Sequence, residues 1–438
     1  MSMANLNTAS LGVHWHDARL VGKVINRGTP EFGYTREWLA TRHNLSPIKV
    51  PFDEPLYHCS DKNFEQLPGF LSDCLPDQWG NGIMMRDFIR DNVQPTPLNM
   101  LAWVGSRGIG ALSFKPAILD ESGSKSWDRV TPLLLCREAQ EVLRKSPPEA
   151  YVHLREAGTA GGAFPKASVA LLPDGTMLCN GNVASKTQEF RDARLGIIKL
   201  DCEDDPARPS TDGRMEYAYM LMARASGIRT AKCEVLKETA DPLRPRYHFF
   251  VDRFDVVAGN QRRLHLTTLA GLHETYNLSY RHFLSTARTL SQNRAELLEG
   301  VRRMIFNVRA GNADDHAKNH SFIYDDTTNR WSFSPAYDLT LNYSLDQKFN
   351  GLSEVTFGKS PRVSALLELV SEFGVTESDF KTIDDEVKKS IASWSTFAQQ
   401  AGLSSGDEER ARSLHELIAG TLEAPTPFRK TTKRKRIF

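Results

Sequence analysis

Gly311-Asn312-Ala313-Asp314-Asp315-His316-Ala317-Lys318-Asn319-His320 is the stretch that decides the fold class of this chain. It follows a run with helical apolar spacing at 294–310 and precedes a predicted strand near 321–324. A second polar cluster, Pro335-Ala336-Tyr337-Asp338-Leu339-Thr340, comes after the next predicted strand. One interpretation is a polar turn in which Asp and Asn cap the adjoining elements.

The other interpretation of these two clusters is a phosphotransfer site. Such a site needs a carboxylate to orient the attacking hydroxyl and oxygen ligands for Mg²⁺. Asp314, then Asn319 five residues on, then the later Asp338 provide that set. The spacing Asp314-x4-Asn319 is similar to HRDxxxxN in protein kinases, with Asp338-Leu339-Thr340 in the position of their DFG segment. The composition of the stretch favours this interpretation over a simple turn.

Two segments upstream are candidates for binding phosphate. The run Gly158 to Lys166 is rich in glycine, which allows close backbone approach, although it matches neither GxxxxGK[ST] nor GxGxxG. Taken alone, it is also consistent with a flexible turn. Lys199 ends a short apolar strand and could contact phosphates with Glu216 on the following helix as its ion-pair partner. The simpler interpretation is an edge-strand lysine that reaches solvent.

The composition is that of an ordinary globular protein. The 438 residues predict two or three domains, and a formal net charge of +1 gives no basic field for nucleic acid. We find no apolar run near the roughly 20 residues needed to cross a bilayer and no signal peptide in residues 1–10. The six cysteines are scattered and predict reduced thiols. We therefore expect a cytoplasmic protein without membrane contact.

Element patterns divide the chain into a sheet-rich first half and a helix-rich second half. A hairpin is predicted around the Pro173-Asp174-Gly175 turn, and helices are predicted at 215–226, 294–310, 363–373, 377–402 and 408–422. The predicted domain boundaries are 1–125 for a small N-terminal subdomain, 126–258 for the rest of the N-lobe, 259–423 for a helical C-lobe, and 424–438 for a basic tail.

An ordered set of short motifs resembles the HipA family, the kinase half of a bacterial type II toxin–antitoxin pair. The motifs are Gly161-Gly162-Ala163-x-Pro165-Lys166, Ile198-Lys199, Asp252-Arg253-Phe254-Asp255, Asp314-Asp315-His316-x-Lys318-Asn319 and Tyr337-Asp338-Leu339. Residues 22–77 resemble the small domain that precedes the kinase core in this family. The resemblance implies an α+β, two-lobed protein-kinase-like fold with a sheet-rich N-lobe and an all-helical C-lobe.

The resemblance also implies roles for individual residues. Asp314 would be the catalytic base, while Asn319 and Asp338 would hold Mg²⁺. ATP would contact Gly161, Gly162, Ala163, Lys166, Lys199, Asp252, Arg253, Phe254, His316 and Lys318. A Ser at the start of the family's glycine-rich loop is autophosphorylated, and Thr159 stands in that place here. Phe164 is a second departure, because the family usually has a polar or basic residue there.

The implied activity is that of a toxin-type protein serine/threonine kinase that uses ATP and Mg²⁺. Its implied partners are a small helix-turn-helix antitoxin similar to HipB, operator DNA contacted mainly through that antitoxin, and a protein substrate such as an aminoacyl-tRNA synthetase. Halting translation in this way would give dormancy or drug tolerance.

Three alternatives remain open on the sequence alone. The chain could be a non-catalytic, nucleotide-binding corepressor that keeps the fold, a reading that the Thr159 and Phe164 departures allow. It could be a metal-dependent hydrolase built on aspartates and histidines, although no recognised ligand spacing is present. The histidines concerned are His265, His273, His316 and His320. The tail at 430–436 could contact nucleic acid or be a solvated chain end, and we favour the latter.

Overall fold

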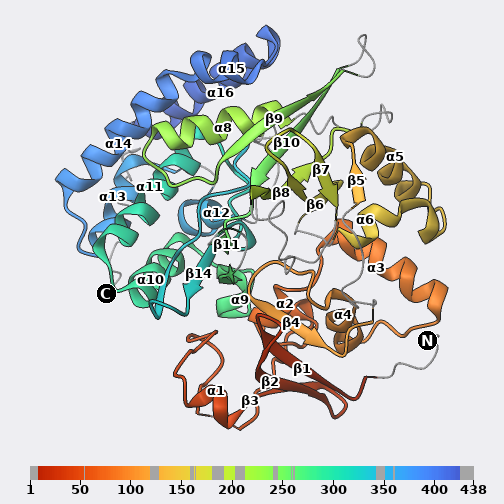
Figure 1. Ribbon diagram of the computed structural model, residues 1–438. Helices are drawn as coiled ribbons and strands as arrows, with labels where there is room; N and C mark the ends of the chain where they lie inside the picture. Colours follow the sequence, from red (N-terminus) through yellow and green to blue (C-terminus); the bar gives the residue numbers. More distant parts are fainter. Residues whose placement is uncertain are drawn as a thin grey trace, which may run out of the picture.

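The computed structural model describes residues 8–53, 55–118, 128–157, 162, 164–179, 192–202, 213–239, 245–257, 259, 262–341, 351–358 and 361–424. The chain forms a small N-terminal unit, a central antiparallel sheet and a helix-rich region, which Figure 1 colours in this order from red to blue. The predicted tail at 424–438 lies outside the described residues except for Ala424, and so does Thr159.

The N-terminal unit, residues 10–115, is built on a sheet in the order β3-β2-β1-β4. Alternating burial along β1 places Leu11, Val13 and Trp15 in the core, as a half-buried strand requires. The strands are β1 (Ser10–Trp15), β2 (Arg19–Asn26), β3 (Pro30–Tyr34) and β4 (Leu112–Lys115). Between β3 and β4 come α1 (Arg36–Leu39), η1 (Lys62–Phe64), α2 (Gly69–Ser72), α3 (Gln78–Asp91) and α4 (Pro97–Val104).

The central sheet has the order β5-β7-β6-β8-β10-β9, with antiparallel neighbours throughout. Its strands are β5 (Asp128–Val130), β6 (Lys166–Leu171), β7 (Met177–Cys179), β8 (Arg194–Lys199), β9 (Cys233–Glu238) and β10 (Arg246–Asp252). Around it lie α5 (Pro132–Leu143), η2 (Pro148–Tyr151), α6 (Val152–Glu156) and α8 (Gly213–Ala225). The predicted hairpin is confirmed, since Gly175 takes φ +85° in the turn between β6 and β7.

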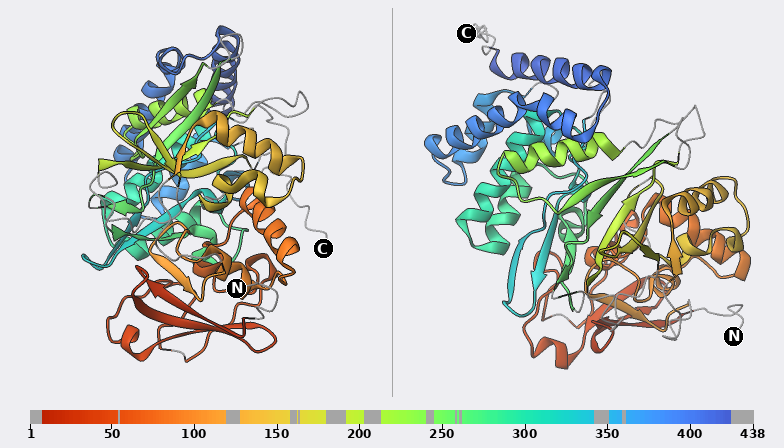
Figure 2. Two further views of the ribbon diagram at one scale, coloured as in Figure 1. Left: turned by 45° about the vertical axis from the view of Figure 1, so that its right-hand side comes forward. Right: turned by 45° about the horizontal axis from the view of Figure 1, so that its top comes forward.

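The helix-rich region begins after the central sheet. Its helices are α9 (Leu269–His273), α10 (Tyr280–Ser291), α11 (Arg294–Ala310), η3 (Ala317–Asn319), α12 (Leu352–Phe357), α13 (Val363–Ser371), α14 (Glu377–Ala392), α15 (Trp394–Ala401) and α16 (Ser405–Glu423). The bounds of α11 are those predicted from its apolar spacing. Both views of Figure 2 show α14, α15 and α16 together at the end of the molecule away from the N-terminal unit.

Two details of the second half differ from the predictions. The C-lobe is not all-helical, because β13 (His265–Thr268), β14 (Ser321–Asp325) and β15 (Arg330–Phe333) form a three-stranded sheet. A small ribbon of β11 (Val256–Val257) and β12 (Arg262–Arg263) precedes it. The helix predicted over 377–402 is two helices, since Ser393 leaves the helical conformation at φ −90°, ψ +13° and allows Trp394 to be buried.

The N-terminal unit packs directly against the helix-rich region. A Cβ added to Gly69 would lie 2.0 Å from the carbonyl oxygen of Gly271, so only two glycines allow α2 and α9 to approach this closely. The Tyr57 hydroxyl donates to Glu274 Oε2 over 2.6 Å, and the Gly69 amide donates to Glu274 Oε1 over 2.9 Å. Buried residues of all three regions belong to one hydrophobic cluster. The N-terminal unit therefore packs together with the central sheet and the helix-rich region as one body.

Among the residues that the structure describes, none of the helices combines the length and the apolar character needed to cross a bilayer. All six cysteines are free, as the sequence predicted.

Candidate active site

The segment that decides the fold, residues 311–320, leaves α11 at a fixed point; we call it the aspartate loop. Gly311 ends the helix with φ +70°, and its amide donates to Asn307 O, which completes the left-handed cap. The Asn312 side chain then donates to Asn307 Oδ1 over 3.0 Å. These two contacts hold the start of the loop against the buried face of α11.

Asp314 is the exposed carboxylate of the aspartate loop. Its side chain is 59% exposed, and its Oδ1 lies 3.6 Å from His316 Nε2. The Asn319 side-chain nitrogen donates to Asp314 O over 2.8 Å, which closes the loop on itself. Partial burial raises the pKa of Asp314, the nearby charge of His316 opposes that rise and Asp338 adds to it. The two predicted carboxylates are therefore close enough to influence each other's protonation.

Asp338 connects the aspartate loop to the central sheet. Its backbone takes the left-handed conformation at φ +56°, directly after Tyr337, whose hydroxyl donates to Lys318 O over 2.7 Å. Lys199 Nζ donates to Asp338 Oδ1 over 2.6 Å. The positive charge of Lys199 lowers the pKa of Asp338 to about 2, so this carboxylate is ionised at neutral pH.

Lys199 lies on β8, between β6 and β10, so the edge-strand interpretation is wrong. Its ammonium lies 2.8 Å from both carboxylate oxygens of Glu216 on α8, which confirms the predicted ion pair. Burial alone would lower the pKa of Lys199, but Asp338 and Glu216 outweigh burial and raise it. The lysine therefore stays charged and joins the sheet, α8 and the Asp338 turn at one point.

Lys166 is the cross-strand neighbour of Lys199 in the β6–β8 register. It is buried, with 5% of its surface exposed. Burial, together with the adjacent charge of Lys199, lowers the pKa of Lys166 to about 8. Two neighbouring ammonium groups at the end of a sheet form a site that an anion such as phosphate would stabilise.

The glycine-rich segment is described only in part. Gly161, Ala163 and Thr159 lie outside the described residues. Gly162 takes φ +112°, its amide donates to Asp77 Oδ2 over 2.8 Å, and its carbonyl accepts from the Trp79 amide over 3.2 Å. Gly162 is therefore hydrogen-bonded at both its amide and its carbonyl to the start of α3 in the N-terminal unit.

The residues predicted to meet adenine begin with Asp252, the last residue of β10. The Asp252 carboxylate binds Arg194 over 2.6 Å, and the Arg253 guanidinium forms a buried pair with Asp255 over 2.6 Å. The Phe254 ring stacks on Tyr337 with centroids 5.7 Å apart. Because the Asp252 and Arg253 side chains are engaged in these pairs, an adenine contact at these two residues would use their backbone alone.

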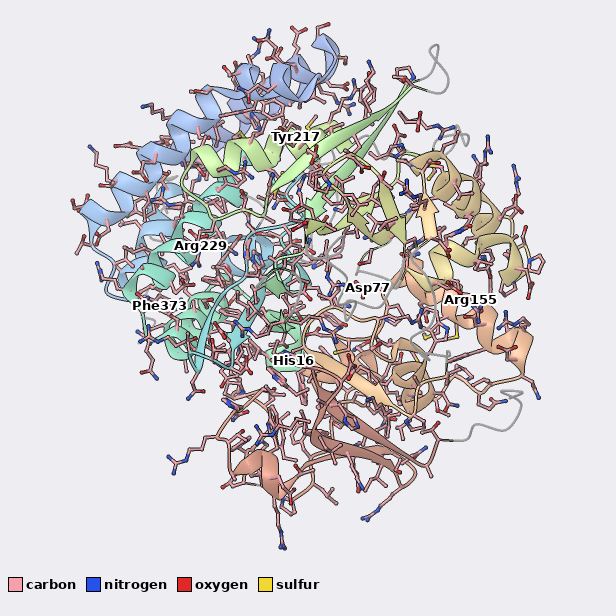
Figure 3. All side chains as sticks on the ribbon, viewed as in Figure 1. His16, Asp77, Arg155, Tyr217, Arg229 and Phe373 are labelled. Carbon is pink, nitrogen blue, oxygen red and sulfur yellow. The ribbon has the colours of Figure 1, made fainter. Side chains whose placement is uncertain are left out.

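Lys318 and Asp77 form a pair that sequence reasoning missed. Lys318 Nζ makes a short ion pair with Asp77 Oδ1. Burial lowers the pKa of Lys318, but Asp77 together with Tyr276 and Asp73 raises it overall. Figure 3 labels Asp77 in the middle of the molecule, between the central sheet and the N-terminal unit. No sequence pattern indicated this pair, because the two residues lie 241 positions apart in the sequence.

The oxygen groups of the site fit a magnesium ion. The Asp338 carboxylate keeps one oxygen beyond the one that Lys199 occupies, and Asn319 uses its nitrogen on Asp314 O, which leaves its amide oxygen as the ligand atom. Carboxylate and amide oxygens are what Mg²⁺ prefers, with the remaining positions taken by water and phosphate.

Among the described residues, no group of three or more His, Cys, Asp or Glu side chains is placed to hold a metal ion.

The histidines of the hydrolase alternative do not gather in one site. His265 is buried and bonds Leu45 O over 2.9 Å, and His273 bonds Thr286 Oγ1 over 2.7 Å. Burial lowers the pKa of His320 to about 3, and its ring packs on Phe283. Within the described part of the chain, these side chains are structural, which removes the support for a histidine metal centre.

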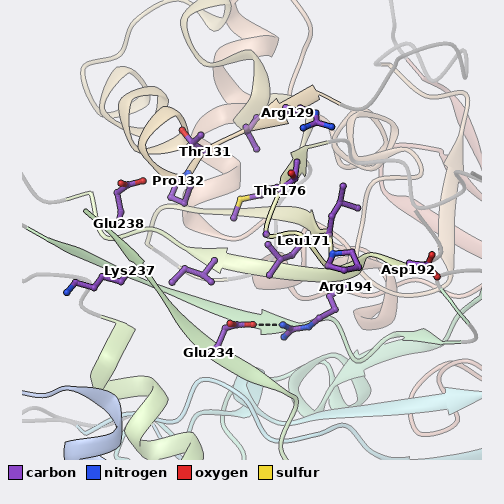
Figure 4. Close-up of a pocket in the computed structure, with 16 residues that line it drawn as sticks. Arg129, Thr131, Pro132, Leu171, Thr176, Asp192, Arg194, Glu234, Lys237 and Glu238 are labelled. Carbon is purple, nitrogen blue, oxygen red and sulfur yellow. Dashed lines mark hydrogen bonds and ion pairs between the residues drawn. The ribbon is translucent and has the colours of Figure 1, made fainter. Parts of the chain in front are cut away.

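A separate cavity of about 760 Å³ lies on the other face of the central sheet (Figure 4). Arg194 lines it and pairs with Glu234, and Arg194 and Lys199 are an odd number of residues apart on β8. Successive side chains of a strand point to opposite faces, so the cavity faces away from Lys199. It is therefore not the candidate active site.

Comparisons with known proteins give matches over both the N-terminal unit and the rest of the chain. The family model described as HipA-like C-terminal domain matches residues 158–395, and the one described as HipA N-terminal domain matches residues 11–115. A protein of Sinorhizobium fredii (strain NBRC 101917 / NGR234) named putative kinase Y4dM is 24% identical over 250 residues. That match covers 48% of this chain and 59% of the relative, so the chain spans less than two thirds of its length.

A solved structure shares the fold over nearly the whole chain. HipA of Shewanella oneidensis MR-1, in its complex with HipB and operator DNA, aligns with a TM-score of 0.66 and 17% identity. The alignment covers 93% of this chain and 95% of that protein, which confirms the predicted two-lobed kinase-like fold. The C-terminal family model alone matches more than half of the 438 residues, and the chain therefore belongs to the HipA family.

Proposed function

We propose that this chain is an ATP- and Mg²⁺-dependent protein serine/threonine kinase of the toxin type. The observation that supports this best is the position of Lys199, which contacts both Glu216 and Asp338. A lysine on a sheet, paired with a helix glutamate and close to a metal-binding aspartate, is the arrangement that positions ATP phosphates in protein kinases. Mg²⁺, when bound, would neutralise charge on the phosphates.

The roles of the chain's own residues follow from their positions. Asp314, the exposed carboxylate of the aspartate loop, would accept the proton of the attacking Ser or Thr hydroxyl. Asn319 and Asp338 would hold the metal. Lys199 and Lys166 would bind phosphate oxygens from the end of the sheet, and burial of Lys166 makes a phosphate partner more favourable.

The partners that we propose follow from the family. They are a HipB-like helix-turn-helix antitoxin, operator DNA contacted mainly through it, and a protein substrate of the translation machinery such as an aminoacyl-tRNA synthetase. Thr159 is the proposed autophosphorylation residue.

The direct test is incubation of the purified chain with γ-labelled ATP and Mg²⁺, followed by peptide mass mapping, with Asp314→Ala as the paired variant. We expect label on Thr159 or a nearby Ser or Thr, and no label on the variant. A variant that labels at the wild-type rate would remove Asp314 from the catalytic role. A wild-type chain that binds ATP by calorimetry, yet labels neither itself nor any protein of a cell lysate, would instead favour the corepressor.

A further inference from the structure

Asp77 stands at the N-cap position of α3 but does not cap that helix. Its backbone is extended, with φ −73° and ψ −171°, and its side chain makes no hydrogen bond to the first-turn amides. An aspartate at this position ordinarily accepts from the second or third amide of its own helix. Here the carboxylate is directed away from the helix, so another set of partners determines its orientation.

Those partners come from two segments that are distant in sequence. Oδ2 accepts from the Gly162 amide over 2.8 Å, and Oδ1 forms the ion pair with Lys318 Nζ. The neighbouring Trp79 adds two contacts, from its amide to Gly162 O over 3.2 Å and from its indole nitrogen to Lys166 O over 3.1 Å. The start of α3 therefore touches both the central sheet and the aspartate loop.

The position of Asp77 relative to the C-lobe is fixed by a residue four positions earlier. Asp73 is half-buried and accepts three hydrogen bonds, from Thr267 Oγ1 over 2.8 Å, from the Thr268 amide over 2.7 Å and from Thr268 Oγ1 over 2.9 Å. These donors lie at the end of β13, just before α9. The stretch from Asp73 to Trp79 is therefore a short bridge between the two lobes.

The contact at Gly162 also depends on the residue type. Gly162 takes φ +112°, a backbone conformation that L side chains rarely adopt, so glycine is the residue that fits this position. The side chains of Asp77 and Lys318 each keep 30% of their surface exposed. A lysine ammonium has three N–H donors, so Lys318 can bind Asp77 and a phosphate oxygen together.

We propose that Asp77 is a positioning residue for phosphotransfer, which holds the glycine-rich segment at Gly162 and the aspartate-loop lysine, Lys318, at a fixed separation around the nucleotide. This inference rests on the proposed kinase function. Asp77 acts through Gly162 and Lys318 and does not itself contact the reacting atoms. Its Oδ1 pairs with the lysine ammonium, and its Oδ2 accepts from the Gly162 amide.

The first experiment needs no catalysis and uses the full chain. Hydrogen exchange followed by mass spectrometry would report on the Gly162 amide, and acetylation by a water-soluble ester would report on the reactivity of Lys318. The variants are Asp77→Ala and Asp77→Asn, with Asp91→Asn at the other end of α3 as the matched control. Asp91 pairs with its sequence neighbour Arg90, so the control removes a carboxylate that contacts neither Gly162 nor Lys318.

We expect Asp77→Ala to speed exchange at Gly162 about tenfold or more, since a charge-assisted hydrogen bond is lost. Asp77→Asn keeps an acceptor for that amide but removes the charge that pairs with the Lys318 ammonium, which leaves the ammonium free to react. It should therefore increase Lys318 acetylation several-fold, with a smaller change in exchange. Unchanged exchange and unchanged acetylation in both variants would overturn the proposal.

The second experiment measures phosphotransfer in a double-mutant cycle. Asp77→Asn should lower kcat about tenfold with a smaller effect on the KM for ATP. In a Lys318→Met background it should add less than about twofold, because the two residues act as one unit. If Asp77→Asn lowers kcat as much in the Lys318→Met background as in wild type, Asp77 does not act through Lys318. If the wild-type chain transfers no phosphate at all, the proposed function fails, while the exchange and acetylation results still decide whether Asp77 joins the lobes.

Discussion

Asp315 should make the stability of this protein depend on pH in the mildly acidic range. The residue follows the catalytic candidate in sequence but is 1% exposed. Its Oδ2 accepts from the Tyr280 hydroxyl over 2.6 Å and from Ser353 Oγ over 2.5 Å, while its Oδ1 has no hydrogen-bond partner among the described residues. Burial raises the pKa of Asp315 to about 6.

The size of the effect follows from that value. A rise from 3.8 to about 6 corresponds to about 3 kcal/mol, at about 1.36 kcal/mol for each pKa unit. The folded state binds this proton more tightly than the unfolded state. The stabilisation is therefore fully present below about pH 4 and is lost as the pH rises through about 6. At neutral pH the ionised Asp315 gives none of it.

The perturbation is Asp315→Asn, which keeps the shape and one acceptor oxygen but cannot ionise. Urea unfolding of both proteins, followed by circular dichroism between about pH 4 and about pH 8, gives the free energy of unfolding. We expect the free energy of unfolding of the variant, minus that of wild type, to rise by about 3 kcal/mol as the pH increases from about 4 to about 8. Asp385→Asn, at an exposed position on α14, should show no such trend. A variant-minus-wild-type difference that stays flat with pH would refute the reasoning.

Three further predictions concern the candidate active site and the contact between α2 and α9. Lys199→Met should weaken binding of a non-hydrolysable ATP analogue about tenfold or more by calorimetry, because it removes a half-buried cation; an unchanged Kd would contradict its phosphate role. Asp338→Asn should abolish the strengthening of that binding by Mg²⁺, measured by titrating Mg²⁺ at fixed analogue concentration, and a wild-type Mg²⁺ response would exclude it as a ligand. Gly271→Ala should destabilise the fold by about 2–4 kcal/mol in urea unfolding, because its Cβ would lie 2.0 Å from Asp73 Oδ2. Gly420→Ala is the control, because a Cβ there meets nothing within 4 Å. A Gly271→Ala protein that is as stable as the Gly420→Ala protein would refute the steric argument.

The sequence predicted best the features that depend on local pattern. The apolar spacing at 294–310 gave the bounds of α11, because a buried helix repeats its apolar contacts every turn. The pairing of Lys199 with Glu216 was also predictable, since a short strand and the next helix bring two residues 17 positions apart together. Polar residues concentrated at 311–320 marked the loop after α11, where a helix end must satisfy its backbone groups.

Features that depend on tertiary contact could not be predicted in this way. Nothing in the neighbourhood of Asp77 distinguishes a helix cap from a contact to Lys318, because both use the same carboxylate. The break at Ser393 follows from the burial of Trp394 against other helices, which overrides a continuous helical pattern. The three-stranded sheet of the C-lobe was missed as a unit because β13 and β14 are far apart in the sequence.

The close contact of Gly69 with Gly271 has a consequence for cutting the chain in two. Backbone that lies against backbone across two glycines leaves no room for a solvent layer, and Tyr57 and Glu274 add a hydrogen bond beside it. A single peptide bond hydrolysed between β4 and β5 would therefore yield two fragments that stay associated. Co-expressed halves should reassemble without a covalent link, whereas the C-terminal half on its own would present an uncovered apolar face and precipitate.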